Sequence, residues 1–145
     1  MMPISSGKLF AHLQACETKL QADNLILWVF NEAENVLVAS LSTSLSLPEE
    51  FKQPLERGLT SQCFLVGLPL LEANLSINPS HDPTFDKYSG KQVQSIMAAP
   101  TYLSHEPYGV LTAARFKGRQ FQEEFSNQNL QELENMALQI QLSSE

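Results

Sequence analysis

The stretch QSIMAAPTYLSHEPYGVLTAARF, residues 94–116, holds two apolar, β-prone segments on either side of a short polar turn. The segments before and after SHEP predict two strands, and SHEP itself predicts the turn of a β-hairpin. Alternation along the first strand sends Ser95 and Met97 to one face of the sheet and Ile96 to the other. If the polar segment before this strand covers the first face, Ser95 and Met97 form the floor of a cavity beneath it.

The same pattern occurs earlier in the chain. LILWVF (25–30) and VLVASL (36–41) are separated by the turn-forming residues 31–35, which predicts another hairpin. LILWVF is apolar throughout, so we expect a central strand that is buried on both faces. Residues 70–75 predict a further strand. Because hairpins dominate, we expect the α+β class, with an antiparallel sheet covered by helices.

Two amphipathic helices are predicted at the ends of the sequence. In residues 6–21 the apolar side chains recur at helical spacing after a serine that can serve as N-cap. In residues 126–143 the same spacing follows Ser126, which is placed as N-cap, while Phe125 can pack on Leu130 as a hydrophobic staple.

A shorter helix is predicted in the middle of the chain. Leu59, Cys63 and Val66 fall on one helical face, and Gly67 and Pro69 end the helix. We expect this face to point toward the core.

Composition indicates one globular domain, residues 1–145. Hydrophobic residues make up 43% of the chain and charged residues 17%, and a chain of this size buries a substantial core. The net charge of −7, with scattered lysines, argues against nucleic acid and anionic membrane surfaces as partners. No apolar run is long enough to span a bilayer or to form a signal peptide, so we expect a cytoplasmic protein.

The polar stretch NPSHDPTFDKYSG, residues 78–90, has the side chains of an active site without their spacing. The Ser-His-Asp run at 80–82 is consecutive, so its side chains diverge and cannot act as a catalytic triad. No second cluster of ligands accompanies it, and no phosphate loop or zinc helix motif is present. We therefore expect no metal site and no enzyme. Asp82 begins a turn, Phe85 can pin the stretch to the core, and Tyr88 suits either a ligand pocket or packing.

In order and spacing these pieces resemble the GAF domain family of small-molecule sensors. The residues that carry the resemblance are GLTSQCFLVGLPL (58–70), Asp82-Pro83-x-Phe85-Asp86, Gly90, Ser95-Ile96-Met97-Ala98-Ala99-Pro100, Tyr108-Gly109-Val110-Leu111 and Phe125-Ser126. The resemblance implies a GAF-like α/β/α sandwich with a central antiparallel sheet of about six strands flanked by helices. It also implies a ligand pocket on one face of the sheet, under a lid formed by residues 76–92. The ligand-binding residues that it implies are Asn74, Ser76, Asp82, Phe85, Tyr88, Ser95 and Met97.

Departures from the family pattern reduce the number of ligands and cofactors that this domain is expected to bind. The lid is shorter than in cyclic-nucleotide-binding members, and the asparagine-lysine pair of those members is missing after residues 108–116, which argues against a cyclic nucleotide. Phytochrome-like members attach a bilin through a cysteine in or near the lid, and no cysteine follows Cys63, which excludes a covalent bilin. His81 is the one loop histidine that could ligate a haem. The ligand stays unidentified.

The resemblance implies a non-catalytic, small-molecule-sensing regulatory domain in signal transduction, a homodimer through its terminal helices. The apolar residues that could form that interface, or could instead pack on the sheet, are Leu9, Leu13, Leu20, Leu133, Met136 and Ile140. One alternative is a ligand-free scaffold for dimerisation or protein–protein interaction, which the short lid favours. Another is an enzyme of the free methionine sulfoxide reductase type, for which Cys63 on a core-facing helix is badly placed as thiolate nucleophile.

Overall fold

The antiparallel sheet predicted from the two hairpins is present. The computed structural model describes residues 6–43, 51–72, 93–116 and 124–144. In chain order the elements are α1 (Ser6–Leu20), β1 (Asn24–Asn31), β2 (Val36–Ser42), β3 (Lys52–Pro54), α2 (Leu59–Val66), β4 (Leu70–Glu72), β5 (Val93–Leu103), β6 (Glu106–Phe116) and α4 (Asn127–Ser144). The six strands form one sheet in the order β3-β2-β1-β6-β5-β4, and every neighbouring pair is antiparallel.

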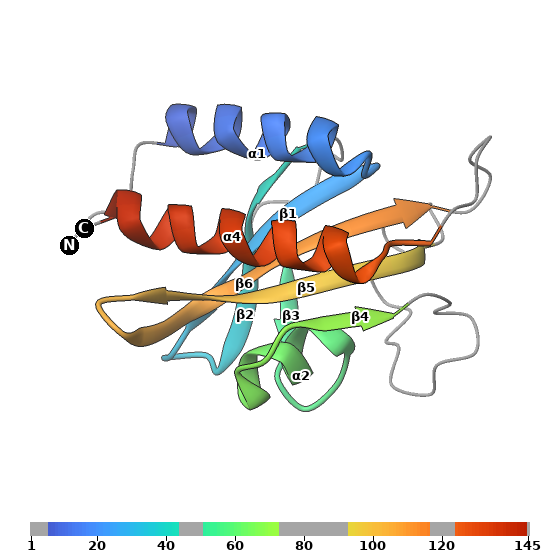
Figure 1. Ribbon diagram of the computed structural model, residues 1–145. Helices are drawn as coiled ribbons and strands as arrows, with labels where there is room; N and C mark the ends of the chain where they lie inside the picture. The colour runs from blue at the N-terminus through green and yellow to red at the C-terminus, as the bar shows by residue number, and fades with distance from the viewer. Residues whose placement is uncertain (1–5, 44–50, 73–92, 117–123, 145) are drawn as a thin grey trace.

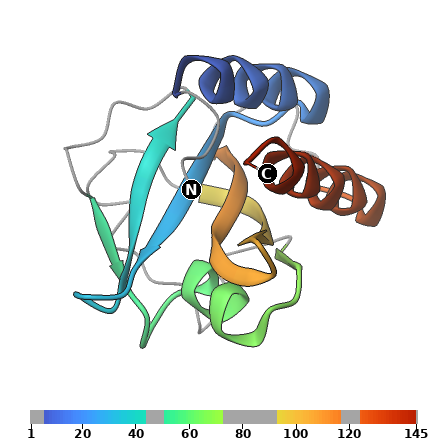
Figure 2. The same cartoon turned by 90° about the vertical axis from the view of Figure 1, so that its left-hand side faces the viewer.

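Helices lie on both faces of this sheet, as the predicted sandwich requires. α1 and α4 lie side by side on one face, and α2 packs on the other (Figures 1 and 2). The strand LILWVF lies within β1, between β2 and β6, and its residues 25–28 are buried. The prediction of a central strand is therefore confirmed. β3 was missed, because three residues are too few to show a period of two.

The larger core cluster lies between the sheet and the two long helices. α1 and α4 contribute Leu9, Leu13, Leu20, Leu133, Met136 and Ile140 to it, and each of these side chains is buried. These are the residues that were expected either to form a dimer interface or to pack on the sheet. The structure shows that they pack on the sheet, so a second copy could contact only the outer surface of these helices.

The β5–β6 hairpin closes through a two-residue loop. Ser104 and His105 have φ angles of 51° and 68°, the left-handed conformation at both central positions that a type I′ hairpin turn requires. Along β6, Gly109 lets two strands approach closely, since a Cβ there would lie 1.8 Å from the carbonyl oxygen of Trp28 on β1. The absence of a side chain at this position is thus a packing requirement.

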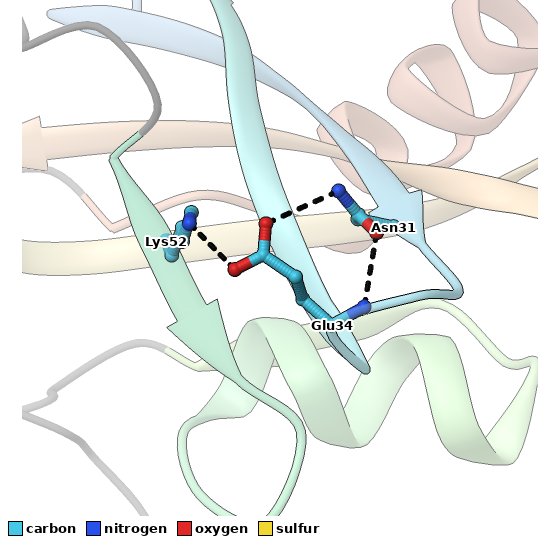
Figure 3. Close-up of polar contacts among 3 residues, drawn as sticks. All are labelled: Asn31, Glu34 and Lys52. Carbon is cyan, nitrogen blue, oxygen red and sulfur yellow. Dashed lines mark hydrogen bonds and ion pairs between the residues drawn. The ribbon is translucent and has the colours of Figure 1, made fainter.

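The β1–β2 turn is tied to the edge strand β3 by polar side chains. The Asn31 side chain accepts a hydrogen bond from the backbone N–H of Glu34 at 3.1 Å. The carboxylate of Glu34 in turn forms an ion pair with Lys52 on β3 at 2.6 Å (Figure 3). This pair is partly exposed, so it helps to fix the position of the short strand without contributing much stability.

Two of the three predicted capping residues, Ser126 and Gly67, are found at their helix ends, and Ser5, which precedes α1, lies outside the described residues. The Asn129 N–H donates to the hydroxyl of Ser126 at 3.1 Å, and the Ser126 N–H donates to the side chain of Asn129 at 3.0 Å. This reciprocal pair is a capping box with asparagine in the position of the usual glutamate. Gly67, with φ of 78°, is the left-handed C-cap of α2. The expectation that Val66 points to the core is wrong, because its side chain is 58% exposed.

Candidate functional site

Two of the seven predicted ligand-binding residues fall within the described part of the chain. These are Ser95 and Met97, and both are completely buried. The remaining five lie outside the described residues: Asn74, Ser76, Asp82, Phe85 and Tyr88. For these five, and for the lid at 76–92, ligand binding stays a prediction.

Ser95 and Met97 do share one face of β5, as the alternation predicted, and that face is the one covered by the long helices. Met97 belongs to the core cluster between the sheet and α1 and α4. Ile96 belongs to a different cluster, where it packs, as does Leu59 of α2, against the buried Val93 and Ala114. The side chains of Ser95 and Met97 are therefore both buried on the face that α1 and α4 cover. Alternation fixes which residues share a face, whereas the helix that covers the face is set by tertiary packing.

The hydroxyl of Ser95 connects two segments that are distant in the sequence. It donates a hydrogen bond to the carbonyl of Glu72, the last residue of β4, at 3.2 Å. It also accepts one from the backbone N–H of Phe125, just before α4, at 3.5 Å. Glu72, which precedes the predicted lid in the sequence, is thereby joined to Phe125 at the start of the last helix through the buried side chain of Ser95.

Arg115, the cross-strand partner of Ser95 on β6, extends this connection to α1. Its guanidinium donates from Nε to the carbonyl of Gln21 at 3.1 Å and from Nη2 to the carbonyl of Leu20 at 3.0 Å. These carbonyls end α1, where no further helical N–H is present to pair with them. The guanidinium carbon also lies 4.2 Å from the ring centroid of Phe125, a cation–π contact.

Sequence reasoning did not single out Arg115. The available signal was a lone cation inside the apolar segment YGVLTAARF. A charged side chain in such a strand has to find buried partners, because an unpaired buried charge is too costly to keep.

The face that α2 covers is filled by aromatic and small side chains. Trp28 donates from its indole nitrogen to the hydroxyl of Thr112 at 3.0 Å and packs edge-on against Phe51. Phe30 and Phe64 stack with their ring centroids 4.8 Å apart. These contacts anchor α2 and the edge strands to the centre of the sheet.

Both cysteines of the chain are buried and free. Burial raises the pKa of the Cys63 thiol to about 12. Burial also raises the pKa of Cys16 to about 11, although Lys19 and a backbone hydrogen bond lower it in part. Because the nucleophile in thiol chemistry is the thiolate, neither side chain is prepared for nucleophilic attack at neutral pH.

No group of three or more His, Cys, Asp or Glu side chains in the described ranges could hold a metal ion. None of the helices that the structure describes combines the length and apolar character of a transmembrane span. Three large aliphatic side chains at the end of α2 are well exposed: Leu65 at 62%, Val66 at 58% and Leu68 at 58%.

Comparison with known proteins finds its matches among solved structures. No protein-family model and no curated protein sequence matches the chain. Residues 122 to 287 of a methyl-accepting chemotaxis protein match with a TM-score of 0.77 at 15% identity, over 93% of this chain and 85% of that one. The GAF domain of a phosphoenolpyruvate-protein phosphotransferase from Coxiella burnetii matches with a TM-score of 0.76 at 15% identity, over 92% and 77%.

An enzyme is also among the structural matches. The type II free methionine-R-sulfoxide reductase from Thermoplasma acidophilum has a TM-score of 0.72 at 18% identity, over 95% of this chain and 93% of that one. At such identities the likeness establishes the fold, and the function has to be argued from the residues of this chain.

Proposed function

This chain has a GAF-like fold, and on that premise we propose that it is a non-catalytic, small-molecule-sensing regulatory domain in signal transduction. The ligand would be held under the lid formed by residues 76–92. The proposal includes a cytoplasmic location and a homodimer. Its output would be a shift in the arrangement or stability of the terminal helices.

The observation that carries this proposal is the polar connection through Ser95. Its hydroxyl bonds to Glu72 at the end of β4 and to Phe125 at the start of α4. Residues 73–92, which include the proposed lid, follow Glu72 directly in the sequence. A ligand that changes the position of the chain at Glu72 would therefore strain or relax a hydrogen bond that leads to α4.

Arg115 gives this connection a second branch. It holds the last carbonyls of α1 and contacts the ring of Phe125. Displacement of Phe125 would thus alter the contacts at the end of α1 and at the start of α4 together. A ligand transmits a signal only if it binds one of two conformations more tightly than the other. In this proposal the two conformations differ in whether the contacts of Arg115 with the end of α1 and with Phe125 are formed.

The cysteines support the non-catalytic part of the proposal. The chain has two, and burial keeps both thiols protonated at neutral pH. A reductase that attacks a sulfoxide needs an accessible thiolate. We therefore expect no turnover of free methionine-R-sulfoxide by the wild-type protein, and measurable turnover that Cys63→Ser abolishes would overturn this part.

The test begins with native mass spectrometry of the freshly purified protein. An extra mass that disappears on denaturation identifies a non-covalent ligand. Hydrogen exchange is then compared before and after the ligand is removed, and we expect altered protection at the end of α1 and the start of α4. Tyr88→Ala should lower the affinity for the ligand about fivefold, the effect of losing one aromatic contact of roughly 1 kcal/mol.

Ser95→Ala is the variant that separates binding from transmission. At a ligand concentration that saturates the variant, we expect it to lose the exchange response at α4, because it removes the hydroxyl that joins Glu72 to Phe125. An unchanged exchange response in this variant would refute the connection. Absence of any bound mass, together with no thermal shift across a metabolite library, would refute the sensor proposal itself.

A second candidate function is a scaffold for dimerisation or protein–protein interaction. The observation that favours it is the exposed surface of Leu65, Val66 and Leu68. No charged residue occurs between positions 58 and 71, although the chain carries a net charge of −7. An uncharged apolar surface lets two acidic molecules meet without bringing like charges together.

Two matched substitutions distinguish the candidate interfaces. Leu65→Gln alters the α2 surface, and Leu138→Gln alters the outer surface of α4, where Leu138 is 54% exposed. Light scattering during size-exclusion chromatography measures the mass of each variant. A monomer from Leu138→Gln alone supports the dimer through the terminal helices, whereas a monomer from Leu65→Gln alone supports the scaffold.

A further inference from the structure

A groove of about 210 Å³ lies between α1 and α4. His12 and Cys16 line it from α1, and Met136 lines it from α4. An imidazole, a thiol and a thioether are the donors that soft metal ions prefer. No part of the proposed sensor function uses these three side chains.

The spacing of the first two donors suits a metal ion. His12 and Cys16 are four residues apart on one helix, so both project into the groove from adjacent turns. The Nε2 atom of His12 and the Sγ atom of Cys16 are 3.8 Å apart. A metal ion bound at roughly 2.0 Å from this nitrogen and 2.3 Å from this sulfur, with the two donors 3.8 Å apart, has an N–metal–S angle of about 125°. This angle is wider than tetrahedral and close to that of a planar, three-coordinate ion.

We propose that His12, Cys16 and Met136 form a binding site for a soft monovalent metal ion, copper(I), in the groove between α1 and α4. The nitrogen of His12 and the sulfur of Cys16 hold the ion from one helix. The thioether of Met136 is the third ligand and comes from the other helix. Binding is not a redox step: Cys–SH and Cu⁺ give Cys–S–Cu and one released proton.

The rest of the groove favours copper(I) over harder ions. The carboxylate of Glu132 also lines it but pairs with Lys19, with 3.8 Å between Nζ and Oε2. The described residues offer no third His, Cys, Asp or Glu ligand here, so the tetrahedral set that zinc usually takes is incomplete. Two sulfurs and one imidazole are the complement that selects copper(I).

The proton released on binding makes the affinity depend on pH. A thiol binds a metal ion as the thiolate, so the metal must displace the proton of Cys16. The groups that face it are His12 and Lys19 on α1 and Glu132 on α4. Affinity should therefore rise with pH, about tenfold per unit between pH 7.5 and 8.5, as expected when one proton is exchanged.

Metal binding would join the two terminal helices directly. His12 and Cys16 hold the ion on α1 and Met136 holds it on α4, so the ion fixes the position of one helix relative to the other. The ion would act on the same output helices as the proposed ligand. The inference stands or falls independently of the small-molecule ligand.

The experiment is an anaerobic titration of the full chain with copper(I) in competition with a chromogenic chelator, bathocuproine disulfonate. The variants are Cys16→Ser, His12→Gln and Met136→Leu. Cys63→Ser is the matched control, because Cys63 is a second buried, free thiol that lies outside the groove. Thermal unfolding of each apo variant checks that it is folded.

We expect wild type and Cys63→Ser to take up one copper(I) per chain and to gain thermal stability with it. Cys16→Ser should lose at least about 100-fold in affinity and its dependence on pH, and His12→Gln and Met136→Leu at least about tenfold. Met136→Leu should also lose most of the thermal gain, because it no longer holds α4. Equal affinity in wild type and Cys16→Ser, loss on Cys63→Ser, or tighter binding of zinc than of copper(I) would overturn the assignment.

Discussion

Removal of the buried guanidinium of Arg115 should cost a large part of the stability of this domain. The side chain is 7% exposed. It donates to the carbonyls of Leu20 and Gln21 and lies over the ring of Phe125. Arg115→Met keeps most of the aliphatic volume and removes the three polar contacts together.

The size of the effect follows from these contacts. Two hydrogen bonds from a charged donor contribute about 1.5–3 kcal/mol each, and a desolvated cation–π contact adds about 1–2 kcal/mol. Relief of the cost of burying and ordering the arginine offsets about 1–2 kcal/mol. We expect a net loss of about 2–7 kcal/mol, against a total stability of about 5–15 kcal/mol for a domain.

Urea unfolding measures this loss. With a slope of about 2 kcal/mol per molar urea, the midpoint should fall by roughly 1–3.5 M. Lys52→Met is the matched control, because it also removes a cation. The ion pair of Lys52 with Glu34, at 2.6 Å, is shorter than the hydrogen bonds of Arg115 but is partly exposed. The control should lose less than about 1 kcal/mol. If the two variants were equally stable, the inference that Arg115 anchors both terminal helices would be refuted.

Three further perturbations test other parts of the structure. Gly109→Ala places a Cβ 1.8 Å from a carbonyl oxygen of β1, so it should yield little soluble protein, whereas Gly7→Ala meets nothing within 4 Å and should keep wild-type solubility and melting temperature. Ser126→Ala removes the N-cap of α4 and should lower the unfolding free energy by about 1 kcal/mol, and an unchanged urea midpoint would contradict the observed capping box. Burial raises the thiol pKa from the ordinary 9.0 to about 11 for Cys16 and about 12 for Cys63, so the stability they contribute is complete below pH 9 and declines as pH rises through the folded values. Urea unfolding at pH 8 and pH 10.5 should show this decline, and the double Cys→Ser variant should show a smaller one.

The parts of the fold that could be predicted are those specified by neighbouring residues. LILWVF is uniformly apolar, which is enough to place it at the centre of the sheet. Ser126 and Gly67 mark helix ends because their capping groups act on the next turn of their own helix. β3 gave no such local signal, since its three residues become a strand only by pairing with β2.

The candidate site was predicted less completely, for a different physical reason. Alternation correctly placed Ser95 and Met97 on one face of β5, but it carries no information on what covers that face. The structure puts α4 there, and the Ser95 hydroxyl connects Glu72 to Phe125, while its role in binding a ligand stays a prediction. Arg115 has its partners more than ninety residues away in the sequence, at the end of α1.

The sequence alone determined the α+β class, the two hairpins and the helix caps at Gly67 and Ser126, because periodicity and capping act over a few residues. Tertiary structure alone decided which sheet face each helix covers and which apolar residues remain exposed. Leu133 and Ile140 are buried in the core, whereas Leu65 and Val66 remain exposed at the surface. The tertiary structure also brought His12, Cys16 and Met136 to one groove. These outcomes depend on contacts between residues far apart in the chain, which no local pattern encodes.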